Sequence, residues 1–220
     1  MAMPKHIAIS LDDISDRCSK SNISYGEGCE IYFKHLNELL EIQAKLKIPI
    51  VTVFLLPENI EKSGSEYLLF SDCIADFFNQ LSTNSLVNAQ KIKISVFGKW
   101  YNLPGNAIES LKNIIELTKD YDTFFANFCI NYDGQGEIVD ACKLIAKQAE
   151  LGKIDASMVT KGTIKENIYS SYFLAPDIIL IYGSRKLSGL LLWDSVNSNI
   201  VFADKPFMEF KENDFEKFIE

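Results

Sequence analysis

The chain has 220 residues, a hydrophobic content of 47% and a formal net charge of −8. This length and hydrophobic content suit one globular domain spanning residues 1–220. The negative charge argues against a nucleic-acid partner, because the phosphate backbone binds a basic face. The cysteines are five, an odd number, and form no C-x-x-C pair; with only two histidines, this composition argues against a zinc site.

Nothing at the N-terminus has the pattern of a secretory leader, and no apolar run approaches the 18 residues of a membrane span. Unpaired cysteines are typical of proteins kept in a reducing compartment. We therefore expect a soluble, cytoplasmic protein with no integral membrane segment.

Short β-branched runs alternate with longer helical patterns along the chain. Strands are predicted at residues 6–11, 50–55, 92–97, 124–130, 178–181 and 200–202. Helices are predicted at residues 30–46, 66–81, 107–119, 137–151 and 165–174. The strand runs are almost continuously apolar, as strands covered on both faces require. The pattern predicts an α/β fold with a mostly parallel six-stranded sheet flanked by helices, and a site at the carboxyl ends of the strands.

Five blocks of the chain carry a family resemblance. They read H-I-A-I-S-L-D at 6–12, V-T-V-F-L-L-P-E-N at 51–59, V-F-G-K-W at 96–100, N-F-C-I-N-Y-D-G-Q-G-E-I-V-D-A at 127–141, and D-I-I-L-I-Y-G-S-R-K-L-S-G-L-L-L-W at 177–193, which continues to Phe210. In this order they resemble the blocks of the cis-prenyltransferases, the undecaprenyl diphosphate synthase family. The resemblance implies the cis-prenyltransferase fold and a homodimer.

Members of that family condense an allylic isoprenoid diphosphate with isopentenyl diphosphate and use magnesium. The resemblance places the catalytic aspartate at Asp12 and keeps an asparagine at Asn59. It also places Lys62 where the family has an arginine, but Asp16 where the family has a phosphate-binding arginine and Tyr25 in place of a second one. The expected allylic diphosphate site is therefore strongly altered.

The site for isopentenyl diphosphate departs further from the family pattern. Its two arginine positions hold Ile181 and Lys186, its serine is kept as Ser188, and its magnesium-binding glutamate becomes Asn199. Losing one arginine and the metal ligand removes on the order of 4–6 kcal/mol of binding free energy. This amounts to roughly a thousandfold in affinity, which disfavours ordinary chain elongation.

The altered loop has an aspartate-rich spacing of its own. Asp12, Asp13 and Asp16 read D-D-x-x-D, as in trans-prenyltransferases and class I terpene synthases, where such carboxylates bind magnesium and magnesium bridges to the diphosphate. We interpret these three aspartates as the catalytic and Mg²⁺-binding residues, although a solvated acidic turn is an equally weighted alternative. The candidate contacts to the diphosphate are Arg17, Lys20, Asn59, Lys62, Lys186 and Ser188.

The function that these residues favour is Mg²⁺-dependent ionisation of a short allylic isoprenoid diphosphate, with loss of diphosphate. The expected outcome is non-standard: cyclisation, as in a terpene synthase, or irregular prenyl transfer. Two alternatives stay open, regular cis-elongation with isopentenyl diphosphate and a non-catalytic partner subunit of a cis-prenyltransferase. Phe77 and Phe78 are expected in the core, and His6 is expected to satisfy hydrogen bonds near its strand.

Overall fold

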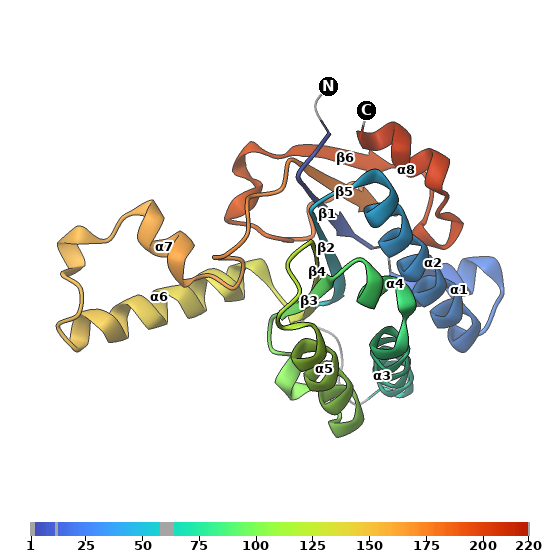
Figure 1. Ribbon diagram of the computed structural model, residues 1–220, viewed down its shortest axis with the longest axis horizontal. Coiled ribbons are helices and arrows are strands. Elements are labelled where there is room, and N and C mark those ends of the chain that lie inside the picture. Colours follow the sequence, from blue (N-terminus) through green and yellow to red (C-terminus); the bar gives the residue numbers. More distant parts are fainter. Residues whose placement is uncertain (1–2, 12, 58–63, 220) are drawn as a thin grey trace.

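The fold is an α/β fold built on one parallel sheet, as predicted. The computed structural model describes residues 3–11, 13–57 and 64–219. Its sheet has six strands in the order β3-β4-β2-β1-β5-β6, and every neighbouring pair is parallel (Figure 1). The strands are β1 (His6–Ser10), β2 (Ile50–Pro57), β3 (Ile92–Phe97), β4 (Phe124–Tyr132), β5 (Ile178–Tyr182) and β6 (Asn199–Ala203).

Four of the five predicted helices are present, the helix predicted at 165–174 is shifted and shorter because it ends at Asn167, and three further α-helices were not predicted. They are α1 (Ile14–Ser21), α2 (Tyr25–Leu46), α3 (Ser65–Thr83), α4 (Ser85–Ala89), α5 (Gly105–Thr118), α6 (Gly134–Glu150), α7 (Lys161–Asn167) and α8 (Glu212–Ile219). The additional helices are α1, α4 and α8. Each helix in the described ranges is too short or too polar to cross a bilayer.

The two faces of the sheet are covered differently. In β1, Ile7 and Ile9 point into a large core that also contains side chains of α2, α3, α5 and α8, whereas Ala8 joins a smaller cluster on the opposite face. This alternation follows from the two-residue period of a strand. The smaller cluster is completed by strand residues and by connecting segments around Tyr169, Phe173 and Leu190. Both faces are therefore buried, which explains the continuous apolar runs.

Helices α6 and α7 depart from the expected arrangement. We expected the predicted helix at 137–151 to flank the sheet, but α6 and α7 extend away from it as an arm (Figure 1). Apolar side chains of this arm remain exposed, including Leu144 at 53% and Met158 at 68%. The arm is held at its base, where Glu137 at the start of α6 accepts from Tyr132 of β4 and Lys165 of α7 donates to Asp194.

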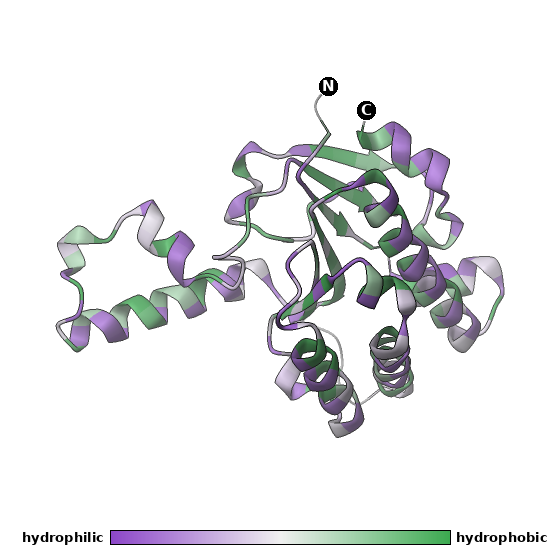
Figure 2. Ribbon diagram, viewed as in Figure 1, coloured by the Kyte–Doolittle hydropathy of each residue, from purple (hydrophilic) through white to green (hydrophobic). Residues whose placement is uncertain are grey.

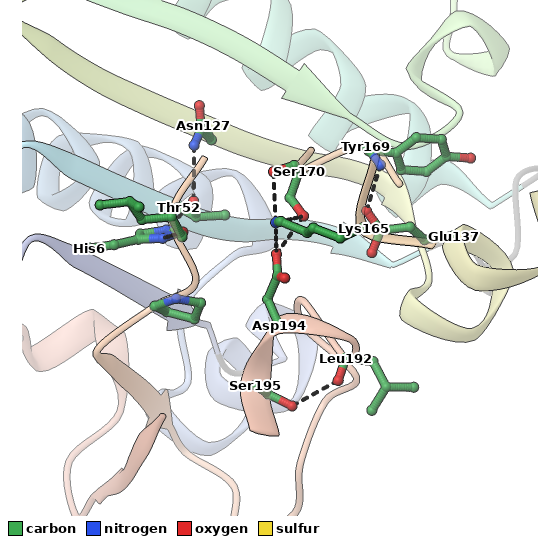
Figure 3. Close-up of polar contacts among 12 residues, drawn as sticks. His6, Thr52, Asn127, Glu137, Lys165, Tyr169, Ser170, Leu192, Asp194 and Ser195 are labelled. Carbon is green, nitrogen blue, oxygen red and sulfur yellow. Dashed lines mark hydrogen bonds and ion pairs between the residues drawn. The ribbon is translucent and has the colours of Figure 1, made fainter. Parts of the chain in front are cut away.

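His6 makes the buried hydrogen bonds that were expected of it. Its Nε2 lies 2.8 Å from Thr52 Oγ1, and its Nδ1 lies 2.6 Å from the carbonyl oxygen of Leu174. A carbonyl only accepts, so Nδ1 carries the proton and Nε2 accepts from the Thr52 hydroxyl. Asn127 donates a further bond to Thr52 Oγ1 at 3.1 Å (Figure 3). The neutral ring thus links β1 to β2 and to the segment before β5.

Acid should destabilise the fold through His6. Burial lowers the pKa of His6 from 6.5 to about 4. Between these values the unfolded chain binds a proton that the folded chain does not, so this contribution is complete above pH 6.5 and is lost as the pH falls towards 4. The loss saturates at about 3 kcal/mol. Urea denaturation from pH 7 to 4 and an NMR titration of the ring would measure it. The decrease of the unfolding free energy with falling pH should persist in the His35→Gln control. A His6 ring that titrates near pH 6.5 in the folded protein would contradict the attribution of this decrease to His6.

Candidate active site

A cavity of about 490 Å³ opens at the carboxyl ends of β1 and β2. Its floor is apolar and aromatic, and includes Tyr32 of α2, Phe70 of α3 and the end of β2. Its rim is polar and carries Asp13, Glu66 and Ser188. A cavity beyond strand ends, with an apolar interior and a few polar groups, is the usual form of a small-ligand site in a parallel α/β fold.

Asp13 caps helix α1 at the rim of this cavity. Its Oδ1 accepts hydrogen bonds from the backbone nitrogens of Ser15, at 2.9 Å, and Asp16, at 3.3 Å. These N–H groups are the orphan donors that would otherwise favour an anion at a helix N-terminus. Asp13 therefore occupies the helix end with its own carboxylate, and a bare diphosphate would meet negative charge there.

Glu66 is the second rim carboxylate, and sequence reasoning missed it. Ser15 donates its hydroxyl to Glu66 Oε1 at 3.1 Å, which connects the start of α1 to the first turn of α3. Burial, helped by the carboxylates of Glu66 and Asp13 among other groups, raises the pKa of Tyr25, so the Tyr25 phenol stays protonated. Glu66 is the first residue of the helix predicted at 66–81, but nothing in its local sequence indicates that it binds a metal ion or a substrate.

The side chains of Asp16 and Arg17, two further members of the predicted loop, lie outside the cavity. Asp16 accepts a hydrogen bond from Lys20 Nζ at 2.7 Å, and this bond lowers the pKa of the Asp16 carboxyl. Both side chains are exposed, and neither lines the cavity. Arg17 donates through Nη2 to the carbonyl oxygen of Gly183 at 3.1 Å, so α1 is tied to the end of β5. The D-D-x-x-D spacing is therefore divided between the cavity rim and the outer surface.

Other predicted site residues are only partly accounted for. Ser188 lines the cavity, whereas Lys186 is exposed and its backbone nitrogen donates to Ser184 Oγ at 3.1 Å. Asp12, Asn59 and Lys62 lie outside the described residues. Within the described ranges, no cluster of three or more histidine, cysteine, aspartate or glutamate side chains is arranged to hold a metal ion.

On the expected acceptor side, Ile181 is buried in the second cluster at 1% exposure, so this position offers apolar packing and no charge. Asn199 begins β6 and is exposed. Arg185 lies nearby in the chain but forms an exposed ion pair with Asp204 at 3.1 Å. Ile181, Asn199 and Arg185 therefore supply no buried cation for a second diphosphate.

A second polar cluster lies at the base of the arm (Figure 3). Lys165 Nζ and Ser170 Oγ both donate to Asp194 Oδ2 at 2.6 Å. Glu137 accepts from the Tyr132 hydroxyl at 2.6 Å and from the backbone nitrogen of Tyr169 at 3.0 Å, and burial raises the pKa of its carboxyl. None of these groups lines the cavity, so we interpret the cluster as structural.

Phe77 and Phe78 are core residues, as expected, at 2% and 0% exposure. Their rings pack against Phe128 of β4 with centroid distances of 5.9 and 5.0 Å. Neither lines the cavity, and the aromatic residue of α3 that does so is Phe70.

Comparison with known proteins agrees with the resemblance seen in the sequence. The undecaprenyl diphosphate synthase family model matches residues 16–220. The tritrans,polycis-undecaprenyl-diphosphate synthase (geranylgeranyl-diphosphate specific) of Thermoplasma volcanium is 31% identical over 96% of this chain and 83% of its own. The enzyme of the same name from Methanopyrus kandleri is 27% identical over 96% and 79%.

Solved structures give the same fold. Lavandulyl diphosphate synthase from Lavandula x intermedia, in complex with dimethylallyl diphosphate, superposes with a TM-score of 0.92. The alignment covers 99% of this chain and 94% of that one at 22% identity, so it supports the fold alone. By its family model and its curated relatives, the chain belongs to the undecaprenyl diphosphate synthase family of prenyltransferase enzymes.

Proposed function

We propose that this prenyltransferase holds a short allylic isoprenoid diphosphate in the cavity between β1, β2, α2 and α3. The prenyl chain would lie on the apolar floor formed by Tyr32 and Phe70, with the diphosphate at the rim. A volume of about 490 Å³ falls within the range of small-ligand sites, about 300–1,000 Å³. The observation that carries the proposal is this joining of an apolar floor to an acidic, oxygen-rich rim.

The rim suits magnesium better than a bare anion. Mg²⁺ prefers oxygen ligands, and the rim offers the carboxylates of Asp13 and Glu66 with the hydroxyls of Ser10 and Ser15. We propose that Asp13 and Glu66 hold the ion together with Asp12, and that Asp16 would join only by leaving Lys20. Bound Mg²⁺ would neutralise the leaving diphosphate. Asp13 would also hold the start of α1, and the protonated Tyr25 would offer a neutral contact beside the ligand.

We further propose that the prenyl group passes to an acceptor other than isopentenyl diphosphate. Ile181 is buried in an apolar cluster, and Asn199 lacks the negative charge of a magnesium-binding carboxylate. Membership of a prenyl-transfer family favours transfer over cyclisation, so the terpene synthase outcome suggested by the aspartate spacing is not retained. Regular elongation is the second candidate, and it is favoured by the names of the archaeal relatives.

The arm supports a proposal of self-association. Hydrophobic residues recur along the ribbon of the arm (Figure 2). Apolar side chains of the arm and of the segment after it are exposed at Val139, Leu144, Leu151, Met158 and Tyr172. Exposed apolar surface that is larger than usual is typical of an interface. We therefore propose a homodimer in which the arm of each subunit packs on the other. The five free cysteines also fit the reducing, cytoplasmic location that we propose.

One assay tests the substrate and the acceptor together. The protein is incubated with Mg²⁺ and dimethylallyl, geranyl or farnesyl diphosphate, each with and without isopentenyl diphosphate, and both released diphosphate and organic product are counted. We expect release without isopentenyl diphosphate, with one diphosphate freed for every two substrate molecules consumed, as coupling of two allylic molecules requires. EDTA should stop it.

The other outcomes are equally informative. Release that requires isopentenyl diphosphate would establish regular elongation and refute the proposed acceptor. One diphosphate freed per substrate molecule would indicate capture of the cation by water or by its own chain, and would also refute coupling. If no combination of substrates released diphosphate, the proposal that short allylic isoprenoid diphosphates are substrates would be refuted.

A further inference from the structure

A second cavity, of about 440 Å³, lies in the groove between α2 and α3. It shares no lining residue with the cavity proposed for the prenyl substrate, which is called the prenyl cavity below. Two thiols line it, Cys29 from α2 and Cys73 from α3, beside the rings of Phe33 and Phe77. Neither cysteine contributes to the rim of the prenyl cavity. The proposed function leaves this pair unexplained.

The register of the two helices brings these thiols opposite each other. Phe33 lies four residues after Cys29, and Phe77 lies four residues after Cys73, so each ring is on the same helix face as the thiol one turn earlier. The Phe33 and Phe77 ring centroids are 5.1 Å apart. The same faces therefore meet one turn earlier, where Cys29 and Cys73 line the same cavity.

The two thiols differ in exposure and in pKa, as the two successive steps of a thiol–disulfide exchange require. Cys73 is partly exposed to the groove, whereas Cys29 is fully buried. Hydrogen bonding to Cys29 lowers the pKa of Cys73, against the opposing effects of burial and nearby carboxylates, while the same interaction and burial raise the pKa of Cys29. Cys73 is therefore the thiol that a reagent meets first as a thiolate, and Cys29 is positioned to react second.

We propose that Cys29 and Cys73 form an oxidisable pair that a small disulfide converts into a cross-link between α2 and α3. The Cys73 thiolate attacks one sulfur of the reagent, expels one thiolate and forms a mixed disulfide. Cys29 then loses its proton and attacks the Cys73 sulfur, which expels the second thiolate. Two protein thiols are oxidised, and one small disulfide is reduced to two thiols.

The cross-link would act on the walls of the prenyl cavity. Tyr32 lies three residues after Cys29 on α2, and Phe70 lies three residues before Cys73 on α3; both line that cavity. A disulfide fixes the separation and orientation of the two residues that it joins, so oxidation would restrict the movement of α2 relative to α3. We expect diphosphate release by the oxidised protein to slow severalfold. This consequence rests on the proposed function, whereas the cross-link itself does not.

Cystamine is the probe of choice, because the carboxylates of Glu30, Asp72 and Asp76 act on Cys73 and favour a cationic reagent. Trypsin separates the two cysteines into peptides 21–34 and 63–91. We expect the oxidised protein to yield these peptides joined, two hydrogens lighter than their sum. Cys29→Ser should stop at one cysteamine adduct on Cys73, and Cys73→Ser should leave Cys29 unmodified.

Cys142→Ser, which removes an exposed thiol on α6, is the matched control and should cross-link like the parent. A stable adduct on Cys73 of the parent chain, or a link from Cys29 to Cys18, would overturn the pairing. A confirmed cross-link with an unchanged rate of diphosphate release would refute the effect on the prenyl cavity. If the reduced protein also released no diphosphate, that result would count against the proposed function and not against the cross-link.

Discussion

Asp13→Asn is expected to raise the Mg²⁺ concentration for half-maximal diphosphate release on the order of 10–100-fold, as losses in a metal site typically do. The exchange leaves helix α1 intact, because asparagine caps helices as well as aspartate and its oxygen can accept from the Ser15 and Asp16 nitrogens. Only the negative charge at the rim is removed. The variant therefore separates the two roles that the structure gives to Asp13.

Whether Asp13→Asn weakens or strengthens substrate binding distinguishes two models of the rim, one with an Mg²⁺ bridge and one without. If Mg²⁺ bridges the carboxylates and the diphosphate, loss of charge weakens the bridge and Asp13→Asn requires more metal. If the diphosphate binds without a bridge, the same loss removes repulsion, so the variant should bind the substrate more tightly than the parent does even when Mg²⁺ is present. Tighter binding by Asp13→Asn in saturating Mg²⁺, measured calorimetrically with an unreactive allylic diphosphate analogue, would disprove the bridge.

Asp133→Asn is the matched control. Asp133 caps α6 by accepting from the Gly136 nitrogen at 2.7 Å, and it lies outside the cavity lining. This substitution makes the same chemical change at another helix start, and its magnesium requirement should equal that of the parent. Glu66→Gln should repeat the Asp13 effect, because the amide oxygen can still accept from Ser15. The two losses should not simply add if both carboxylates hold one ion.

The sheet was predictable because its strands are buried on both faces. In β1 all five residues are buried, so an apolar run bounded by polar residues was enough to locate it. Helix α1 was missed because it buries only Ile14 and Cys18, and therefore carries little apolar periodicity. It is stabilised by the Asp13 cap, which the sequence pattern suggested to us as a metal ligand. A short polar helix of this kind depends on local capping more than on its hydrophobic pattern.

The candidate site was less predictable, because side-chain directions and long-range placement decide it. The aspartate spacing located the Asp13 rim, but Lys20 lies four residues after Asp16 and pairs with it on the outer surface. Glu66 reaches the rim from a segment 53 positions away from Asp13, and only the packing of α3 against α2 brings it there. No local pattern contains that information.

Lys165→Met is expected to destabilise the fold by about 3–5 kcal/mol, the usual loss when one partner of a buried ion pair is removed. Lys165 Nζ donates to Asp194 Oδ2 at 2.6 Å and to the Ser170 carbonyl oxygen at 3.0 Å. The Asp194 side chain is only 5% exposed, so without Lys165 its carboxylate is left buried beside a single hydroxyl donor (Figure 3).

Two comparisons identify the cause of the loss. Lys165→Met/Asp194→Leu leaves no buried charge and should recover most of the stability. Lys147→Met removes a lysine on α6 whose pairing with Glu150 is exposed, and it should cost less than about 1 kcal/mol. Urea denaturation measures all four proteins. A loss in Lys165→Met no larger than that in Lys147→Met would show that the arm-base pair contributes little to stability.

The His6 ring reports the same charges independently of stability. Asp194 raises and Lys165 lowers the pKa of this histidine, although burial outweighs both. Removing Lys165 while keeping Asp194 should therefore move the His6 pKa upward from about 4, whereas Lys147→Met should leave it unchanged. A raised His6 pKa in Lys165→Met would show that Lys165 acts on this ring through its charge. An unchanged His6 pKa would contradict this electrostatic contribution of Lys165, whatever the loss of stability.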